Sequence, residues 1–87
     1  MKQPIYYLNG KFVSKNDAKV SVYDMGFLRS YGVVEFLITY NARPFKLQEH
    51  LDRFYNSARL IDLGIPFSQA KIKKLIFKNI LHKILNN

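Results

Sequence analysis

The sequence predicts an α+β fold, a small antiparallel sheet built from hairpins with two C-terminal helices packed on it. Three observations support this prediction. An Asn-Gly pair joins two short apolar runs near the start of the chain, and a run rich in β-branched and aromatic residues occupies residues 33–40. From residue 47 onward, apolar residues recur at helical spacing. Strands therefore come first and helices last, within one small domain.

The first hairpin is predicted at residues 5–13. Residues 5–8 and 11–13 are short strand candidates, and Asn9-Gly10 between them is the dipeptide that best accommodates the two positive φ angles of a type I′ turn. A polar loop follows. We expect residues 18–22 to form a further short extended piece.

A second hairpin is predicted in the middle of the chain. Asp24 and Gly26 interrupt the pattern before it, and residues 33–40 then form its first strand. Residues 41–43 turn the chain back through residues 44–46. We expect this hairpin to lie at the centre of the sheet.

One apolar stripe predicts the first of the two helices. Its members recur at alternating spacings of four and three: Leu47, Leu51, Phe54, Ala58 and Ile61. Gly64 is expected to end this helix in the left-handed conformation, and Pro66 prevents its continuation. Ser68 offers an N-cap for the last helix, although Lys71 stands where a capping box would have Glu or Gln.

The composition limits the possible functions. The chain has no cysteine, which excludes disulfides, thiolate catalysis and cysteine-ligated zinc. No apolar run reaches the roughly 20 residues that a membrane span requires. The two histidines, His50 and His82, fall in different predicted helices without clustered carboxylates, so we expect no metal site. We expect a soluble, cytoplasmic protein without a membrane partner.

The net charge of +8 could indicate a nucleic-acid or anionic-membrane partner. Its distribution favours another interpretation. The last predicted helix interleaves Lys71, Lys73, Lys74, Lys78 and Lys83 with Ile72, Leu75, Ile76, Ile80 and Ile84. This pattern is typical of the solvated face of an amphipathic helix, and we favour it over a nucleic-acid-binding stripe.

Two charged residues are candidates for a site. Arg53 lies at the edge of the apolar stripe, one turn after His50, and its guanidinium could bind a phosphate through two parallel hydrogen bonds. The alternative is a surface arginine paired with Glu49. Glu35 stands in an apolar run, where an unpaired carboxylate would be costly to bury, so it needs a partner or water. The alternative for Glu35 is a strand with one solvated face. We interpret His50 as structural.

Three segments resemble the amino-terminal small domain of class IV aminotransferases. They are Gly26-Phe-Leu-Arg-Ser-Tyr-Gly-Val-Val-Glu35, Tyr40-Asn-Ala-Arg-Pro-Phe45 and Gln48-Glu-His-Leu-Asp-Arg-Phe-Tyr-Asn-Ser-Ala58. This pyridoxal-phosphate family includes D-amino-acid and branched-chain aminotransferases and aminodeoxychorismate lyase. The resemblance extends from about Tyr7 to Ser68.

The resemblance implies roles for particular residues. Arg53 would bind the cofactor phosphate, which reverses the preference for a surface arginine. The expected substrate-binding residues are Arg29, Tyr31, Val34, Glu35 and Phe36. Val34, Phe36 and Ile38 share one strand face and would line the cleft, with core packing as the alternative. Two departures from the family pattern, at residues 29–31 and at Val34, leave the substrate open.

The resemblance also implies what the chain does and lacks. Family members transfer an amino group between an amino acid and a 2-oxo acid, with pyridoxal phosphate held by a lysine of a second domain. We expect residues 1–87 to be the small domain only, because none of the fourteen Lys and Arg residues matches that lysine. Alone it should be inactive, with no catalytic residue, and the complete enzyme should be a homodimer. The alternative is a self-associating or basic nucleic-acid-binding module.

Overall fold

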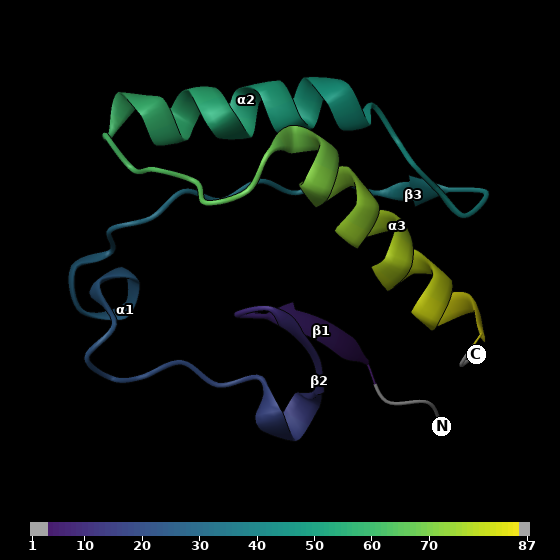
Figure 1. Cartoon of the computed structure of the whole chain (residues 1–87), viewed down its shortest axis with the longest axis horizontal. Coiled ribbons are helices and arrows are strands. Elements are labelled where there is room, and N and C mark those ends of the chain that lie inside the picture. The colour runs from purple at the N-terminus through teal and green to yellow at the C-terminus, as the bar shows by residue number, and fades with distance from the viewer. Residues whose placement is uncertain (1–3, 86–87) are drawn as a thin grey trace.

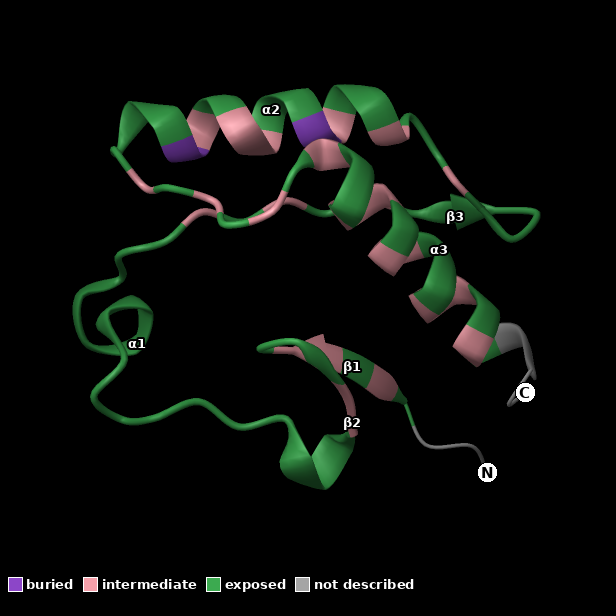
Figure 2. Ribbon diagram, in the orientation of Figure 1, coloured by how far each residue is buried: buried purple, intermediate pink, exposed green. Residues whose placement is uncertain are grey.

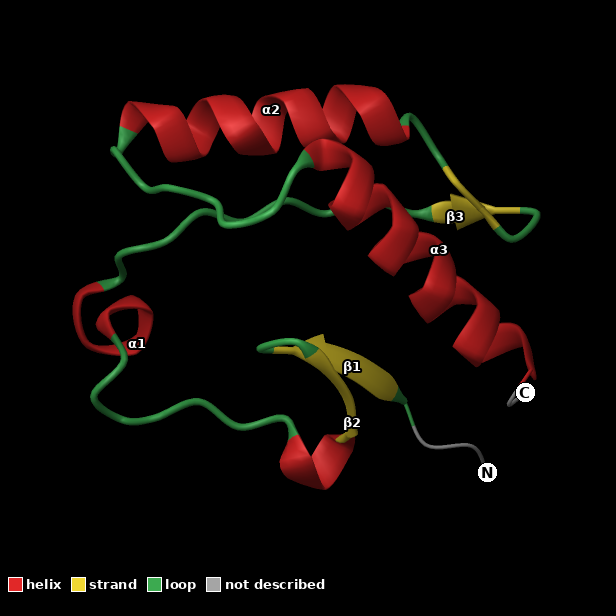
Figure 3. Ribbon diagram, in the orientation of Figure 1, coloured by secondary structure: helices red, strands yellow, loops and turns green. Residues whose placement is uncertain are grey.

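A computed structural model describes residues 4–85, and the side chains of residues 84 and 85, including Ile84, lie outside that description. Its elements follow one another as β1 (Ile5–Leu8), β2 (Lys11–Ser14), a 3-10 turn (Lys15–Asp17), α1 (Met25–Arg29), β3 (Thr39–Tyr40), β4 (Arg43–Pro44), α2 (Leu47–Leu60) and α3 (Gln69–Leu85) (Figure 1). Loops connect the short strands and α1 in the first half, and the two long helices α2 and α3 occupy most of the second (Figure 3). The predicted α+β class is confirmed.

The first hairpin forms as predicted. β1 and β2 pair antiparallel, from Ile5 opposite Ser14 to Leu8 opposite Lys11. Asn9 and Gly10 have φ angles of 50° and 90°, the two positive values that a type I′ turn requires. Local turn chemistry therefore determines the register of this hairpin.

The second hairpin is shorter than predicted. β3 pairs with β4 through Thr39 opposite Pro44 and Tyr40 opposite Arg43, and residues 33–38 belong to no strand. Within residues 4–85 the two hairpins form separate two-stranded sheets, so the prediction that residues 33–40 form a sheet centre is wrong. β-propensity describes how well side chains suit a pleated surface, and it does not supply the neighbouring strand that a ladder needs.

A short helix forms where Asp24 and Gly26 were expected to interrupt the strand pattern. Residues 18–22 form no strand, and α1 begins directly after Asp24. The Gly26 backbone N–H donates to Asp24 Oδ1 at 2.8 Å. Asp24 is thus the N-cap of α1, a role for which its short carboxylate is well suited.

The small core lies under α2. The apolar stripe of this helix is confirmed from Leu47 to Ala58, whereas Ile61 follows the helix and is 39% exposed. Leu51 is only 4% and Ala58 only 2% exposed, and they are the two buried positions among those that Figure 2 colours. The predicted helix end is wrong in detail. Asp62, rather than Gly64, takes the left-handed conformation (φ 58°), and the Leu63 N–H donates to the Ala58 carbonyl at 2.8 Å. This hydrogen bond closes a Schellman motif two residues before Gly64.

α3 begins as predicted and crosses back over the first hairpin. Ser68 Oγ accepts a hydrogen bond from the Lys71 N–H at 3.2 Å, which confirms the N-cap. The helix packs against β1 and β4 with a half-buried apolar face: Ile72, Leu75, Ile76 and Ile80. Its lysines are exposed apart from half-buried Lys73, which contacts Gln48. No helix in residues 4–85 is long and apolar enough to cross a membrane.

Candidate functional site

Glu35, His50 and Arg53 meet where the extended residues 33–38 pass beside α2, and we call these three residues the Glu35 cluster. His50 and Arg53 lie three positions apart on α2, a spacing that places both side chains on one face of the helix. The Glu35 and His50 side chains are 13% and 19% exposed, whereas the Arg53 side chain is 66% exposed. The carboxylate of Glu35 is thus largely shielded from solvent, whereas the Arg53 side chain is largely exposed.

Glu35 accepts hydrogen bonds from both α2 residues. Arg53 Nε donates to Oε2 at 2.9 Å, and Arg53 Nη2 donates to Oε1. His50 Nδ1 lies 2.7 Å from Oε1. Because an ionised carboxylate only accepts hydrogen bonds, we assign the proton of this contact to Nδ1. The expectation that Glu35 needs a partner is confirmed, and Arg53 pairs with Glu35 rather than with Glu49.

The pairing fixes the charge of the cluster. Arg53 first, and His50 second, lower the pKa of Glu35 from its ordinary value of 4.5 to about 2. In return, the hydrogen bonds to Glu35 raise the pKa of Arg53 above its ordinary value. Both side chains are therefore charged at neutral pH.

The guanidinium keeps donors available for an anion. Arginine has five N–H groups, and the contacts with Glu35 use two of them, so three remain. Phosphates and carboxylates are the groups that a guanidinium binds through two parallel hydrogen bonds. The donor set of Arg53 thus fits a phosphate group, and its exposed side chain can reach one.

The predicted cleft residues of the extended segment lie on its uncovered side. Val34 and Phe36 are 73% and 79% exposed, and Ile38 is exposed as well. Val33, Glu35 and Leu37 between them are half-buried. The period-two pattern predicted from the sequence is confirmed, and the alternative that these three apolar residues pack in the core is wrong for this chain.

Arg29 and Tyr31 lie outside the Glu35 cluster, and Tyr31 contacts the chain directly after α2. Arg29 is the exposed last residue of α1. Tyr31 Oη donates to the Ile61 carbonyl at 3.3 Å, one of the carbonyl groups left without an intrahelical partner at the end of α2. No local sequence pattern indicates this contact, because the two residues lie 30 positions apart. A substrate-binding role for either residue remains a prediction.

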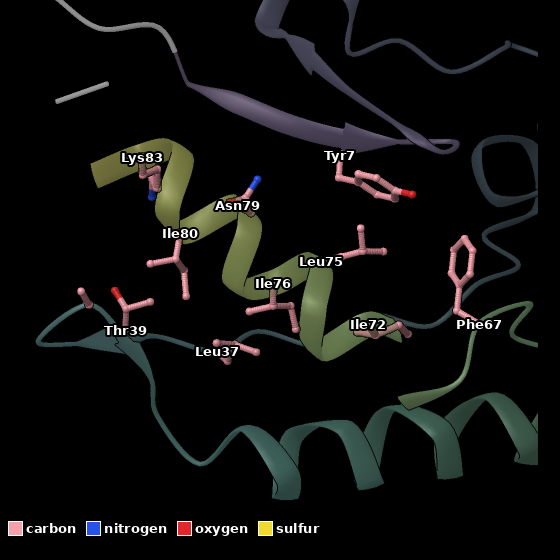
Figure 4. A pocket seen from close by; sticks show the side chains of 11 residues that line it. Tyr7, Leu37, Thr39, Phe67, Ile72, Leu75, Ile76, Asn79, Ile80 and Lys83 are labelled. Carbon is pink, nitrogen blue, oxygen red and sulfur yellow. The ribbon is translucent and has the colours of Figure 1, made fainter. Parts of the chain in front are cut away.

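One cavity lies outside the Glu35 cluster. It measures about 610 Å³ and lies between the first hairpin, α3 and the start of the second hairpin. Figure 4 shows Tyr7 of β1 on one side of α3 and Leu37 and Thr39 on the other. Apolar side chains of α3 form most of its lining, and none of the predicted site residues lines it. Across residues 4–85, no group of His, Asp and Glu side chains is arranged to hold a metal ion.

Comparison with known proteins identifies similar chains. The family described as Amino-transferase class IV matches residues 32–87, which include the whole Glu35 cluster. The protein named "Putative branched-chain-amino-acid aminotransferase" of Methanocaldococcus jannaschii is 42% identical over 74 residues, or 85% of this chain and 26% of that protein. The D-alanine aminotransferase of Listeria innocua is 39% identical over 79 residues, or 91% of this chain and 27% of that protein. The chain thus spans about a quarter of the length of these relatives.

Proposed function

The chain belongs to the class IV aminotransferases, and we propose that it forms the amino-terminal domain of a pyridoxal-phosphate-dependent enzyme and binds the cofactor phosphate through Arg53. One observation carries this proposal. The Arg53 guanidinium is anchored to Glu35 and keeps three N–H groups for an anion. When bound, the cofactor withdraws electrons from the α-carbon of the substrate amino acid.

The remaining parts of the reaction belong to the complete enzyme. The substrates would be an amino acid and a 2-oxo acid, and Arg29 would meet a substrate carboxylate. The exposed face formed by Val34 and Phe36 would contact the substrate side chain, and its apolar character suits an apolar one. A second domain would supply the lysine that holds the cofactor. We further propose a cytoplasmic homodimer.

Substitution of Arg53 by lysine tests the proposal. Arg53→Lys keeps the positive charge but removes the planar fork, so the dissociation constant of pyridoxal phosphate should rise about tenfold to hundredfold. The measurement is a cofactor titration of the full-length protein that carries this sequence, with thermal melts of the cofactor-free forms.

Arg59→Lys is the matched control. Arg59 is also an exposed arginine of α2, and its Nη2 donates to Asn56 Oδ1 at 2.6 Å. This variant should bind the cofactor as the wild type does. Equal cofactor affinities of Arg53→Lys and wild type would remove Arg53 from the phosphate site. A collapse of cofactor-free stability in Arg53→Lys alone would identify a structural helix arginine instead.

A further inference from the structure

We propose that Glu35 is a positioning residue, which holds the Arg53 guanidinium by one edge and leaves its other edge for the phosphate. This inference rests on the proposed role of Arg53. It assigns Glu35 a function that does not require contact with the substrate or the cofactor.

The geometry of the contact separates the two edges. Glu35 binds the side edge of the guanidinium, formed by Nε and Nη2. Three N–H groups remain: one on Nη1 and one on Nη2 form the end edge, and the second on Nη1 faces the Cδ side. An oxyanion can bind this end edge through two parallel hydrogen bonds. Glu35 and a phosphate can therefore bind Arg53 at the same time.

His50 completes the arrangement by holding Glu35. Its Nδ1 proton donates to Oε1 at 2.7 Å, so α2 grips the carboxylate through two different side chains. Arg53 Nη2 also lies 3.3 Å from His50 Nδ1. Because Nδ1 carries a proton, it cannot accept from Nη2, and the last Nη2 proton stays available for an anion.

Positioning should strengthen phosphate binding by reducing the entropy lost on binding. Arg53 is long and largely exposed, and ordering such a side chain weakens binding by about twofold to tenfold. The contact with Glu35 orders it before the phosphate arrives. The negative charge of Glu35 also repels a phosphate, which weakens phosphate binding and so opposes the gain from positioning. A double-mutant cycle separates the two effects. Repulsion between Glu35 and the phosphate persists when Arg53 is replaced by lysine, whereas the positioning of the guanidinium does not.

The experiment compares pyridoxal phosphate with pyridoxal, which lacks the phosphate group. Dissociation constants are measured for the full-length protein with Glu35→Gln, with Arg53→Lys and with both substitutions. Glu35→Gln should weaken binding of pyridoxal phosphate about twofold to tenfold when Arg53 is present. In the Arg53→Lys background, Glu35→Gln should leave binding of pyridoxal phosphate unchanged or tighter. Binding of pyridoxal should be unchanged throughout, which also shows that the variants are folded.

Glu35→Asp separates geometry from charge. It keeps the negative charge but shortens the reach to Arg53, so it should weaken binding of pyridoxal phosphate as Glu35→Gln does. The inference would be overturned if both Glu35 variants bound pyridoxal phosphate as tightly as the wild type or more tightly. It would also be overturned if Glu35→Gln weakened this binding equally with Arg53 present and with Arg53→Lys. If Arg53→Lys itself had no effect, the proposed function would fail rather than the role of Glu35.

Discussion

Acid should destabilise the fold through Glu35 within a defined range of pH. Its pKa is about 2 in the folded chain, lowered by Arg53 and His50 from an ordinary value of 4.5. A carboxyl group with a lowered folded-state pKa stabilises the fold fully above its unfolded pKa, and this contribution is lost as the pH falls through the folded pKa. The loss should therefore begin near pH 4.5 and be complete near pH 2. Within this range, the unfolded chain binds up to about one more proton at this residue than the folded chain.

Two measurements test this reasoning. Urea unfolding of wild type and Glu35→Gln from neutral pH to about pH 2 should show that the stability advantage of the wild type shrinks across that range. Carbon NMR of the Glu35 carboxyl group should show a midpoint near 2, which moves towards 4.5 in Arg53→Lys because that variant loses the largest contribution to the shift. A wild-type midpoint near 4.5, or two parallel stability curves, would refute the ion pair as described.

Two further predictions concern the 87-residue chain alone. It should show no transaminase turnover, because we propose that the lysine that holds the cofactor belongs to a second domain; a cofactor adduct fixed by borohydride on a mapped lysine would contradict this. It should also self-associate through residues 33–40, where Phe36 is 79% exposed, because buried apolar area stabilises association by roughly 25 cal/mol per Å². Light scattering should give a mass above 10.2 kDa that falls in Phe36→Ser, and a strict monomer at high micromolar concentration would rule this out.

The features that the sequence predicted correctly depend on short-range interactions. Asn9-Gly10 determines its own turn, the α2 stripe needs only helical periodicity, and Ser68 caps a helix that begins at the next residue. The wrong predictions concern features for which two nearby residues could take the same role, or which need a partner far away in the chain. Asp62 took the left-handed position expected of Gly64, since Asp tolerates that conformation better than most residues. Residues 33–38 have strand propensity, but propensity does not identify a partner strand.

The Glu35 cluster shows the same limit on prediction. Arg53 and Glu35 were each singled out from the sequence, but their pairing joins residues 18 positions apart, and no local rule brings them together. The role of His50 as a structural residue was predicted without its partner. The available signal was the spacing of His50 and Arg53, which puts two donors on one helix face. Glu35, a carboxylate in an apolar run, needed hydrogen-bond donors, and His50 and Arg53 on α2 could supply them.

Residues 33–38 alternate between two sides, and each side contributes to a different part of the proposed site. Glu35 is on the covered side with Arg53, and Val34 and Phe36 are on the open side. A slip of one residue would exchange the sides and place an apolar side chain against the guanidinium. Two contacts oppose this slip, the Glu35 ion pair and the hydrogen bond from the Phe45 N–H to the Ile38 carbonyl at 2.8 Å. The ion pair that orients Arg53 therefore also keeps the apolar side chains on the face proposed for the substrate.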